Sequence, residues 1–587
     1  MLLERYPELH FRLLWEGITT PLERSSVLWA EDGIDAEIQR FQAKVSLSTI
    51  EVFYLYGLGV GQHLAVLRSW LEEDPRRKLI YLEDDLAAID ACCKEGQKEL
   101  FAHPQVFIRF IPHPRAWSAT LKQCALDFPS KYLELRAIEA YAKNKKKKSA
   151  AQIKLKLLRL SGLFRTYFDE AIYVHQVHQN LFDNLHQLKQ AFDTSGLRDV
   201  FKGVPAMICG AGPSLKQHIE GLKSLEDRAL IIAGGSTVTA LGNLGVFPHI
   251  ALAIDPNEEE VHRFEANVLQ EIPFLFGLRL HPGVFQTLNA PLGYLHTRTA
   301  GPAEGWMQNH FGIVQDVMHD ALGPEALSIT TLSLTLAYIM GCDPIAIVGV
   351  DLAYTGFSRY APGVGAQQTI DPKEFDQPKE QLETLLKRKD VRGNTIYTLV
   401  KWVMEAAVFS RFAKKHSKTK FFRVGQEGLP IKNIPVTTLE AIAARYGNKQ
   451  HDLLGQLHQI VQAWQLKEIT QEKISSVKQD LRLSLEKMEQ ICLAVLEELE
   501  QAKKEEHLPL FPTGKMMGLQ MDFEEELAYP CLFESVGLAF NTKNQRERNL
   551  PALTVELEMD KWRHLLSAAR FYLKRSFIED LSQGENL

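Results

Sequence analysis

Residues able to bind a phosphate group follow the apolar run at positions 205–209, where the chain reads GAGPSL. A helix that begins after a glycine-rich turn presents unpaired N–H groups and the positive end of its dipole, and both favour an anion. We expect Ser214 to cap this helix, Gln217 to complete a capping box, and the N–H groups of Gly212 and Ser214 or Leu215 to contact the phosphate. An ordinary strand-to-helix turn uses the same residue types. The predicted phosphate-binding residues are Gly210, Gly212, Pro213 and Ser214.

Two aspartates end other apolar runs of the same region. Asp255 follows the run at 250–254, and Asp351 follows the fully apolar run at 345–350. If these runs are parallel strands, both carboxylates lie at carboxyl ends, where α/β sheets bind ligands. Each could accept a hydrogen bond from a ribose hydroxyl, or the two could hold one Mg²⁺. The simpler alternative is that each aspartate only caps the helix that follows.

Small residues mark two further helix starts near the predicted site. The apolar run at 229–233 is followed by GGST at 234–237, and SITT at 328–331 precedes an apolar helix at 332–340 that Gly341 should stop. Hydroxyl and glycine residues at helix starts are suited to contacts with phosphate oxygens. We therefore predict that Gly235, Ser236 and Thr331 contribute to a nucleotide site.

A polar segment rich in glycine and proline, residues 352–394, follows Asp351. Its length exceeds that of ordinary connections, which predicts a lid or binding loop. Arg359 offers a forked donor for phosphate or carboxylate. Tyr354 and Tyr360 offer phenols, and Tyr354 is assigned to nucleotide binding. The predicted catalytic residues are Asp351, Arg359 and Tyr360; alternatively, the loop side chains are exposed and bind no ligand.

The order of these runs predicts an α/β fold with a Rossmann-like parallel-sheet core domain at 201–447. Apolar runs at 52–56 and 79–82, a glycine-rich turn at 57–61 and acidic residues at 83–85 predict a smaller N-terminal α/β domain at 1–125. This pattern is typical of a nucleoside-binding unit, although a structural or interaction role is the alternative. A helical connector at 126–200 should join the two domains.

Residues 448–587 form a predicted C-terminal helical domain. Apolar residues recur every three or four positions from 474 to 499, which indicates one long amphipathic helix. Further helices are expected at 452–465 and 553–577. No catalytic motif lies here, so we expect a separable module whose deletion leaves nucleotide binding intact. Packing on its own chain and binding of a partner are both open for this helix.

Composition excludes several classes of protein. The 587 residues are 45% apolar and 24% charged, with a net charge of −6, which argues against a general nucleic-acid or membrane-surface binder. No run reaches eighteen uncharged apolar residues, and the charged N-terminal pattern is unlike a signal peptide. Seven scattered cysteines without a CxxC pair fit reduced thiols and no zinc site. We expect a cytoplasmic protein and leave its oligomeric state open.

Six segments, in their order along the chain, resemble the domain shared by the Maf (motility accessory factor) flagellin glycosyltransferases and the MptE-like 6-hydroxymethylpterin diphosphokinases. They also resemble, more distantly, bacterial CMP-sialic-acid sialyltransferases. The segments are GAGPSL at 210–215, IIAGGSTVTAL at 231–241, LGNLGVFPHIALAIDP at 241–256, PIAIVGVDLAYTG at 344–356, VRGNTIYT at 391–398 and VGQEGLPIKNI at 424–434. In the sialyltransferases, tyrosines after the corresponding strand hold the nucleotide phosphate, and Tyr360 falls at about that spacing.

The chain departs from the sialyltransferase pattern at two places. Ala211 stands where those enzymes have an asparagine in the turn, and residues 389–394 contain no histidine where those enzymes have their general base. An acceptor hydroxyl needs a proton acceptor near the leaving phosphate. His310, His319 and Asp351 are the alternatives considered, and none is chosen.

The resemblance implies a transferase and leaves its activity open. A Maf-like glycosyltransferase would move a sialic or nonulosonic-type sugar from a CMP-sugar donor to a protein or glycan hydroxyl, with no obligatory metal. An MptE-like pyrophosphokinase would transfer diphosphate from ATP, with Mg²⁺, to a hydroxymethylpterin. A non-catalytic nucleotide-binding scaffold is the third class. The added domains resemble the Maf layout, which favours the glycosyltransferase.

Overall fold

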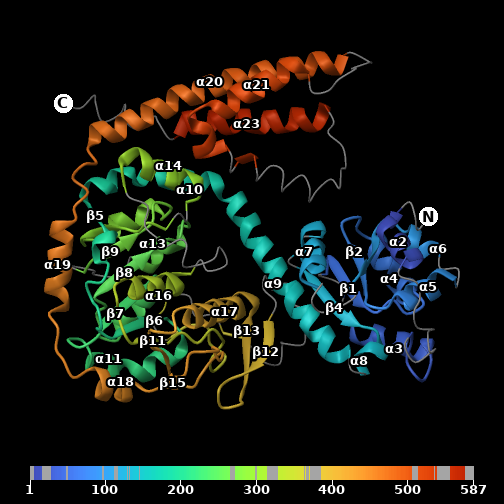
Figure 1. The fold of residues 1–587 in the computed structure, drawn as a ribbon, viewed down its shortest axis with the longest axis horizontal. Coiled ribbons are helices and arrows are strands. Elements are labelled where there is room, and N and C mark those ends of the chain that lie inside the picture. Colours follow the sequence, from blue (N-terminus) through green and yellow to red (C-terminus); the bar gives the residue numbers. More distant parts are fainter. Residues whose placement is uncertain are drawn as a thin grey trace. The chain divides into compact units, whose positions relative to one another are not determined.

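The computed structural model of the chain (Figure 1) divides into two compact units between Tyr167 and Phe168. Helix α9 (Lys146–Ile172) spans this division. The structure describes residues 5–15, 28–45, 47, 50–94, 98–111, 117–128, 130, 132–143, 146–264, 272–297, 300–313, 328–361, 364, 369–370, 385–504, 513–533, 536–537 and 555–575.

The first unit contains a parallel sheet of four strands in the order β3-β2-β1-β4. Its strands are β1 (Val52–Tyr56), β2 (Lys78–Glu83), β3 (Val106–Phe110) and β4 (Leu133–Ala137). Its helices are α2 (Pro7–Trp15), α3 (Ile34–Lys44), α4 (His63–Glu72), α5 (Leu86–Lys94), α6 (Lys98–Ala102), α7 (Trp117–Asp127) and α8 (Glu139–Lys143). The two apolar runs of the sequence are β1 and β2, and the predicted α/β character of this region is confirmed. Strand β4 lies beyond residue 125, so the sheet extends into the stretch that we expected to be a helical connector.

The second unit contains a parallel sheet of nine strands in the order β15-β14-β11-β6-β7-β8-β9-β10-β5. Its strands are β5 (Ala191–Asp193), β6 (Ala206–Cys209), β7 (Leu230–Gly234), β8 (Ile250–Ala253), β9 (Phe274–Phe276), β10 (Leu292–Tyr294), β11 (Ile345–Val348), β14 (Phe421–Val424) and β15 (Val436–Thr437). Every residue of β6, β7, β8 and β11 is buried. A parallel sheet covered on both faces requires such uninterrupted apolar strands, and the predicted Rossmann-like core is confirmed.

The strand order changes direction between β6 and β11. From β6 the chain adds β7, β8, β9 and β10 on one side, and β11 then starts the other side, followed by β14 and β15. In a parallel α/β sheet, the loops at such a reversal diverge to opposite faces and leave a crevice beyond the carboxyl ends of the strands. The glycine turn follows β6 and Asp351 follows β11, so both lie at this reversal.

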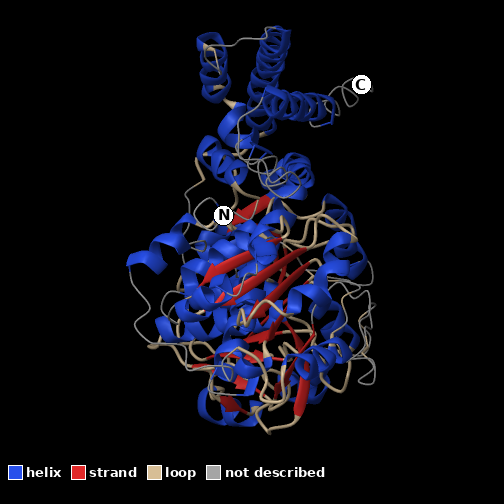
Figure 2. Cartoon of the chain, turned by 90° about the vertical axis from the view of Figure 1, so that its right-hand side faces the viewer, coloured by secondary structure: helices blue, strands red, loops and turns tan. Residues whose placement is uncertain are grey.

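Helices flank the strands, and the group of helices at the top of the view contains no strand (Figure 2). The helices before the last region are α10 (Val174–Asn184), η1 (Leu185–Gln190), η2 (Thr194–Leu197), η3 (Pro213–His218), α11 (Ile219–Lys223), α12 (Ser236–Asn243), α13 (Glu259–Phe264), η4 (Pro282–Thr287), α14 (Pro302–Phe311), α16 (Ile329–Ile339), α17 (Val400–Lys415) and α18 (Leu439–Tyr446). A two-stranded antiparallel hairpin, β12 (Leu385–Lys389) and β13 (Thr395–Leu399), precedes α17.

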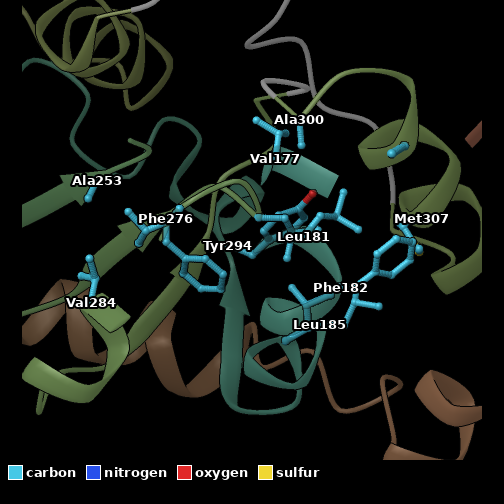
Figure 3. Packing of buried hydrophobic residues seen from close by; sticks show 14 of the residues in the cluster. Val177, Leu181, Phe182, Leu185, Ala253, Phe276, Val284, Tyr294, Ala300 and Met307 are labelled. Atoms are coloured by element: carbon cyan, nitrogen blue, oxygen red, sulfur yellow. The ribbon is translucent and has the colours of Figure 1, made fainter. Parts of the chain in front are cut away.

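The last region contains α19 (Leu453–Ala463), α20 (Gln471–Lys504), α21 (Gly514–Glu525), the π-helix η7 (Tyr529–Phe533) and α23 (Val555–Arg575). The predicted long amphipathic helix is α20, and its apolar stripe is buried. This stripe belongs to the same hydrophobic cluster as the strands of the sheet. Figure 3 shows another part of that cluster, where Leu181 and Leu185 lie near Phe276 and Tyr294.

The C-terminal region also completes the sheet at its β5 edge. Gln465 forms an antiparallel bridge with Phe192 of β5. The N–H of Asp193 donates to the carbonyl of Trp464 at 2.8 Å, and the N–H of Leu466 donates to that of Ala191 at 2.9 Å. An uncovered edge strand is prone to pair with other chains. These residues cover an edge strand and share the hydrophobic cluster of the sheet. That they form a separable module, whose deletion leaves nucleotide binding intact, stays a prediction.

Candidate functional site

Asp351 is locked onto the glycine turn. One carboxylate oxygen accepts the Ser214 hydroxyl, and the other accepts the Ser214 N–H at 3.0 Å. Only 3% of Asp351 is exposed. The aspartate therefore joins the two loops that diverge at the strand reversal, and its oxygens face the protein.

The N–H groups that we expected to hold a phosphate already have partners within the chain. Gly212 donates to the carbonyl of Gly349 at 2.8 Å, Ser214 donates to Asp351, and Leu215 donates to the carbonyl of Gly212 at 3.0 Å. The helix that follows, η3, is a six-residue 3₁₀ helix with Gly212 as N-cap and no side-chain cap. The predicted capping box of Ser214 and Gln217 is wrong, because the hydroxyl of Ser214 binds Asp351 instead.

The two glycines of the turn permit a close approach between the loops after β6 and β11. A β-carbon on Gly212 would lie 2.5 Å from the carbonyl oxygen of Gly349, and one on Gly210 would lie 2.9 Å from the same atom. Any larger residue would push these loops apart. Glycine is therefore needed here for packing within the chain, whatever ligand the turn contacts.

Asp255 lies at the end of β8, away from Asp351. Its carboxylate accepts the Asn257 side-chain amide at 2.9 Å and pairs with Arg263 at 3.4 Å. Three strand-to-strand steps separate β8 from β11, or roughly 14 Å at the usual spacing. Two oxygen ligands of one Mg²⁺ must each lie about 2.1 Å from the ion. The arrangement does not support the alternative that Asp255 and Asp351 share a magnesium ion.

Helix α13 adds two charged residues that the sequence reasoning missed. Glu260 is 3% exposed and forms an ion pair with Arg263. Burial raises the pKa of Glu260 to about 7, Asp255 adds to the rise and Arg263 opposes it. Burial lowers the pKa of Arg263, but Glu260, Asp255 and Tyr360 together raise it by more, so the pKa of Arg263 is raised overall. Arg263 thus pairs with Asp255 and interacts electrostatically with Tyr360, two predicted site residues on different loops.

The segment after Asp351 folds back onto the glycine turn. The N–H of Ala361 donates to the carbonyl of Ala211 at 2.8 Å, which places the neighbouring Tyr360 beside the turn. The Arg359 guanidinium stacks on the ring of Tyr360 at 5.1 Å and on Trp402 at 5.6 Å. Residues 362–363, 365–368 and 371–384 of the expected lid lie outside the described residues.

Tyr354 and Thr331 have structural contacts. Tyr354 is buried, its N–H donates to the carbonyl of Tyr397 at 2.8 Å, and its ring contacts Trp402. Thr331 forms a capping box with Ser328 at the start of α16. Ser328 also donates its hydroxyl to Glu405 at 2.8 Å. A carboxylate therefore already lies at the helix start where we expected a nucleotide phosphate.

Gly235 and Ser236 begin α12 at the end of β7. Gly235 has a φ of +51°, a left-handed conformation that favours glycine. Among the described residues other than its chain neighbours, a β-carbon here would have only the two oxygens of Glu260 within 4 Å, at 3.6 and 3.9 Å. The Glu260 carboxylate thus packs against the start of α12.

The histidines considered as bases take other positions. His310 stacks on Trp306 with ring centroids 3.7 Å apart. His319 lies outside the described residues. The sequence reasoning missed His218, which follows the glycine turn and lies beside Gly425. His218 comes near the end of β14 only through the pairing of distant strands. No local pattern in the sequence indicates this position.

The glycine turn of the first unit is closed by its own acidic residue. Glu83 is fully buried, and its carboxylate accepts four hydrogen bonds. The donors are the N–H groups of Leu58 at 2.7 Å, Asp84 at 2.9 Å and Asp85 at 3.0 Å, and the hydroxyl of Tyr141 at 2.6 Å. In a nucleoside-binding unit, this carboxylate would instead face a ribose. The geometry favours the structural role that we had kept as the alternative.

Within the described ranges, no group of three or more His, Cys, Asp or Glu side chains is arranged to hold a metal ion. Of the helices that the structure describes, none has both the length and the apolar character needed to cross a bilayer.

Part of the second unit is similar to a known protein family. Residues 179–357 match the family model described as 6-hydroxymethylpterin diphosphokinase MptE-like. This range contains the strands from β5 to β11 and the glycine turn, Glu260, Arg263 and Asp351. No curated protein matches the sequence. A structure of the Maf glycosyltransferase from Magnetospirillum magneticum AMB-1 is similar over 100% of this chain and 98% of that chain, with 12% identity and a TM-score of 0.46.

Proposed function

We propose that the chain, whose residues 179–357 match the MptE-like family model, is a nucleotide-dependent transferase. We propose further that it moves a sialic or nonulosonic-type sugar from a CMP-sugar donor to a hydroxyl of a protein or glycan. The reaction breaks the bond between the anomeric carbon and the phosphate oxygen, so the site must stabilise a leaving phosphate.

The observation that carries the proposal is the cationic and phenolic group beside the glycine turn. Tyr360 lies beside the turn, because the N–H of the next residue, Ala361, donates to the carbonyl of Ala211. Arg359 stacks on the Tyr360 ring, and Arg263 on α13 interacts electrostatically with Tyr360. Guanidinium and phenol groups are strong donors to phosphate oxygens. These three side chains can stabilise the departing CMP without a metal shared between Asp255 and Asp351.

We assign the predicted residues as follows. The turn residues Gly210, Gly212, Pro213 and Ser214, together with Gly235, Ser236 and Asp255, border the nucleotide. Asp351 acts as a positioning residue, because its carboxylate holds Ser214 and hence the turn. Tyr354 and Thr331 fix the post-β11 segment and helix α16, which adjoin the site.

The alternative function is transfer of diphosphate from ATP to a hydroxymethylpterin. The activity for which the matched family is named favours it. Magnesium often uses only one or two protein carboxylates together with the substrate phosphates. The exposed carboxylate of Asp255 could serve in that way by itself.

One experiment separates these functions. The full chain is incubated with CMP, with CDP and with ATP plus Mg²⁺, and its thermal midpoint is measured, because ligands that bind the native state raise it. Turnover is then followed as CMP release from CMP-N-acetylneuraminate and as AMP release from ATP with 6-hydroxymethylpterin, with and without chelator. We expect binding of CMP and chelator-resistant CMP release. Magnesium-dependent AMP release would establish the alternative, and binding without turnover would indicate a scaffold.

A further inference from the structure

We propose that Glu260 is the catalytic residue that accepts the proton of the acceptor hydroxyl. This inference rests on the proposed sugar transfer. It supplies the group that the sequence lacks, because residues 389–394 contain no histidine.

The position of Glu260 supports this role. Apart from the chain neighbours of Gly235, its carboxylate oxygens are the only described atoms within 4 Å of the β-carbon position of Gly235. Gly235 follows β7, the strand next to β6. The carboxylate of Glu260 therefore lies at the edge of the sheet where the proposed nucleotide site is.

The surroundings keep the carboxylate in place and tune its affinity for a proton. Arg263, on the same helix, holds one oxygen of Glu260 in an ion pair. Asp255, which follows β8, raises the pKa of Glu260, and Tyr360 from the post-β11 segment raises the pKa of Arg263. Burial is the largest cause of the raised pKa, which is about 7. A base with a pKa near the working pH is the most effective proton acceptor.

Other candidate bases are less suitable. Both carboxylate oxygens of Asp351 accept hydrogen bonds from Ser214. His218 lies beside Gly425, after β14, on the other side of the strand reversal from β7. Nδ1 of His310 donates to the carbonyl of Trp306 within its own helix.

The step is balanced in atoms and charge. The acceptor oxygen forms a bond to the anomeric carbon while the bond from that carbon to the phosphate oxygen breaks. The electron pair of the broken bond leaves with CMP. The hydroxyl proton moves to Glu260, which becomes neutral and returns the proton to solvent.

The test uses the full chain, CMP-N-acetylneuraminate as donor and water as the acceptor. Glu260→Gln should lower the rate of CMP release by about 10²- to 10⁴-fold and leave the affinity for CMP within about threefold. Glu259→Gln is the matched control, because Glu259 is the exposed neighbour on the same helix. The rate of the wild-type chain should fall below about pH 7 as Glu260 gains a proton.

A measurement on the wild-type chain alone covers the case in which Glu260→Gln does not fold. Organic cosolvent should raise the apparent pKa of the acidic limb of the pH–rate profile, because deprotonation of a carboxyl group creates a charge. Deprotonation of a histidine creates no new charge, so a limb caused by a histidine would keep its pKa. A histidine-like limb, or a folded Glu260→Gln variant within tenfold of the wild-type rate, overturns the inference while sugar transfer stands. A wild-type chain that neither binds CMP nor releases it from the donor overturns the proposed function and this inference together.

Discussion

Replacing Ser214 by alanine tests the lock between the loops after β6 and β11. The change removes the hydroxyl that donates to the buried carboxylate of Asp351 and leaves the Ser214 N–H in place. Loss of a hydrogen bond to a charged group costs about 1.5–3 kcal/mol. A unit of roughly 400 residues has an unfolding entropy of about 0.8 kcal/mol/K, so the thermal midpoint should fall by about 2–4 °C.

Scanning calorimetry of the full chain measures this shift in the transition of the second unit. Ser224→Ala is the control, because Ser224 is exposed and its hydroxyl donates to the carbonyl of Gly221 only; it should shift the midpoint by less than about 1 °C. Asp351→Asn, alone and combined with Ser214→Ala, should show a coupling of about 1–3 kcal/mol. Equal shifts for Ser214→Ala and Ser224→Ala, or strictly additive effects of Ser214→Ala and Asp351→Asn, would refute the lock.

Three further predictions concern other parts of the chain. Gly196→Ala should destabilise the second unit by about 1–3 kcal/mol in calorimetry, because the new β-carbon would lie 2.4 Å from Trp464. Gly305→Ala is the control and should be neutral or slightly stabilising, because open space surrounds the β-carbon position of Gly305. Burial lowers the pKa of His178 to about 3, so between about pH 6.5 and pH 3 this histidine binds a proton in the unfolded chain only. The free energy of unfolding should therefore fall as the pH is lowered through this range. In calorimetry, His178→Gln should reduce the slope of that fall by about 1.4 kcal/mol per pH unit. Glu83→Gln should destabilise the first unit by about 2–3 kcal/mol, which calorimetry would show as a lower thermal midpoint for the transition of that unit. A midpoint equal to that of the wild type would contradict the structural role of Glu83 in the turn.

The central strands were predictable because burial on both faces demands uninterrupted apolar residues. β6, β7, β8 and β11 coincide with apolar runs in the sequence. The three-residue strands β5 and β10 were missed, since AFD and LGY carry no periodic signal over so few positions. β5 becomes a strand through pairing with β10, about a hundred residues later in the chain.

The candidate site was predictable in part for a related reason. The location of Asp351 and the glycine turn at strand ends follows from local patterns, and the structure brings them into contact. Which N–H groups remain open to a ligand depends on the loop from a distant strand, so the engagement of Gly212 with Gly349 had no local signal. Glu260 stands in a charged run that is typical of an exposed helix face. Its burial arises only when α13 packs beside Gly235.

The bridge between Phe192 and Gln465 has a consequence for synthesis on the ribosome. β5 emerges before β6, yet its partner β10 and its covering segment are made much later. At roughly 5–20 residues per second, the interval between Phe192 and Gln465 lasts about a quarter of a minute to a minute. During that time, the nascent chain exposes an edge that only its own later residues can cover. Slower translation of residues 300–465 should lengthen this vulnerable interval and increase the chain's dependence on chaperones.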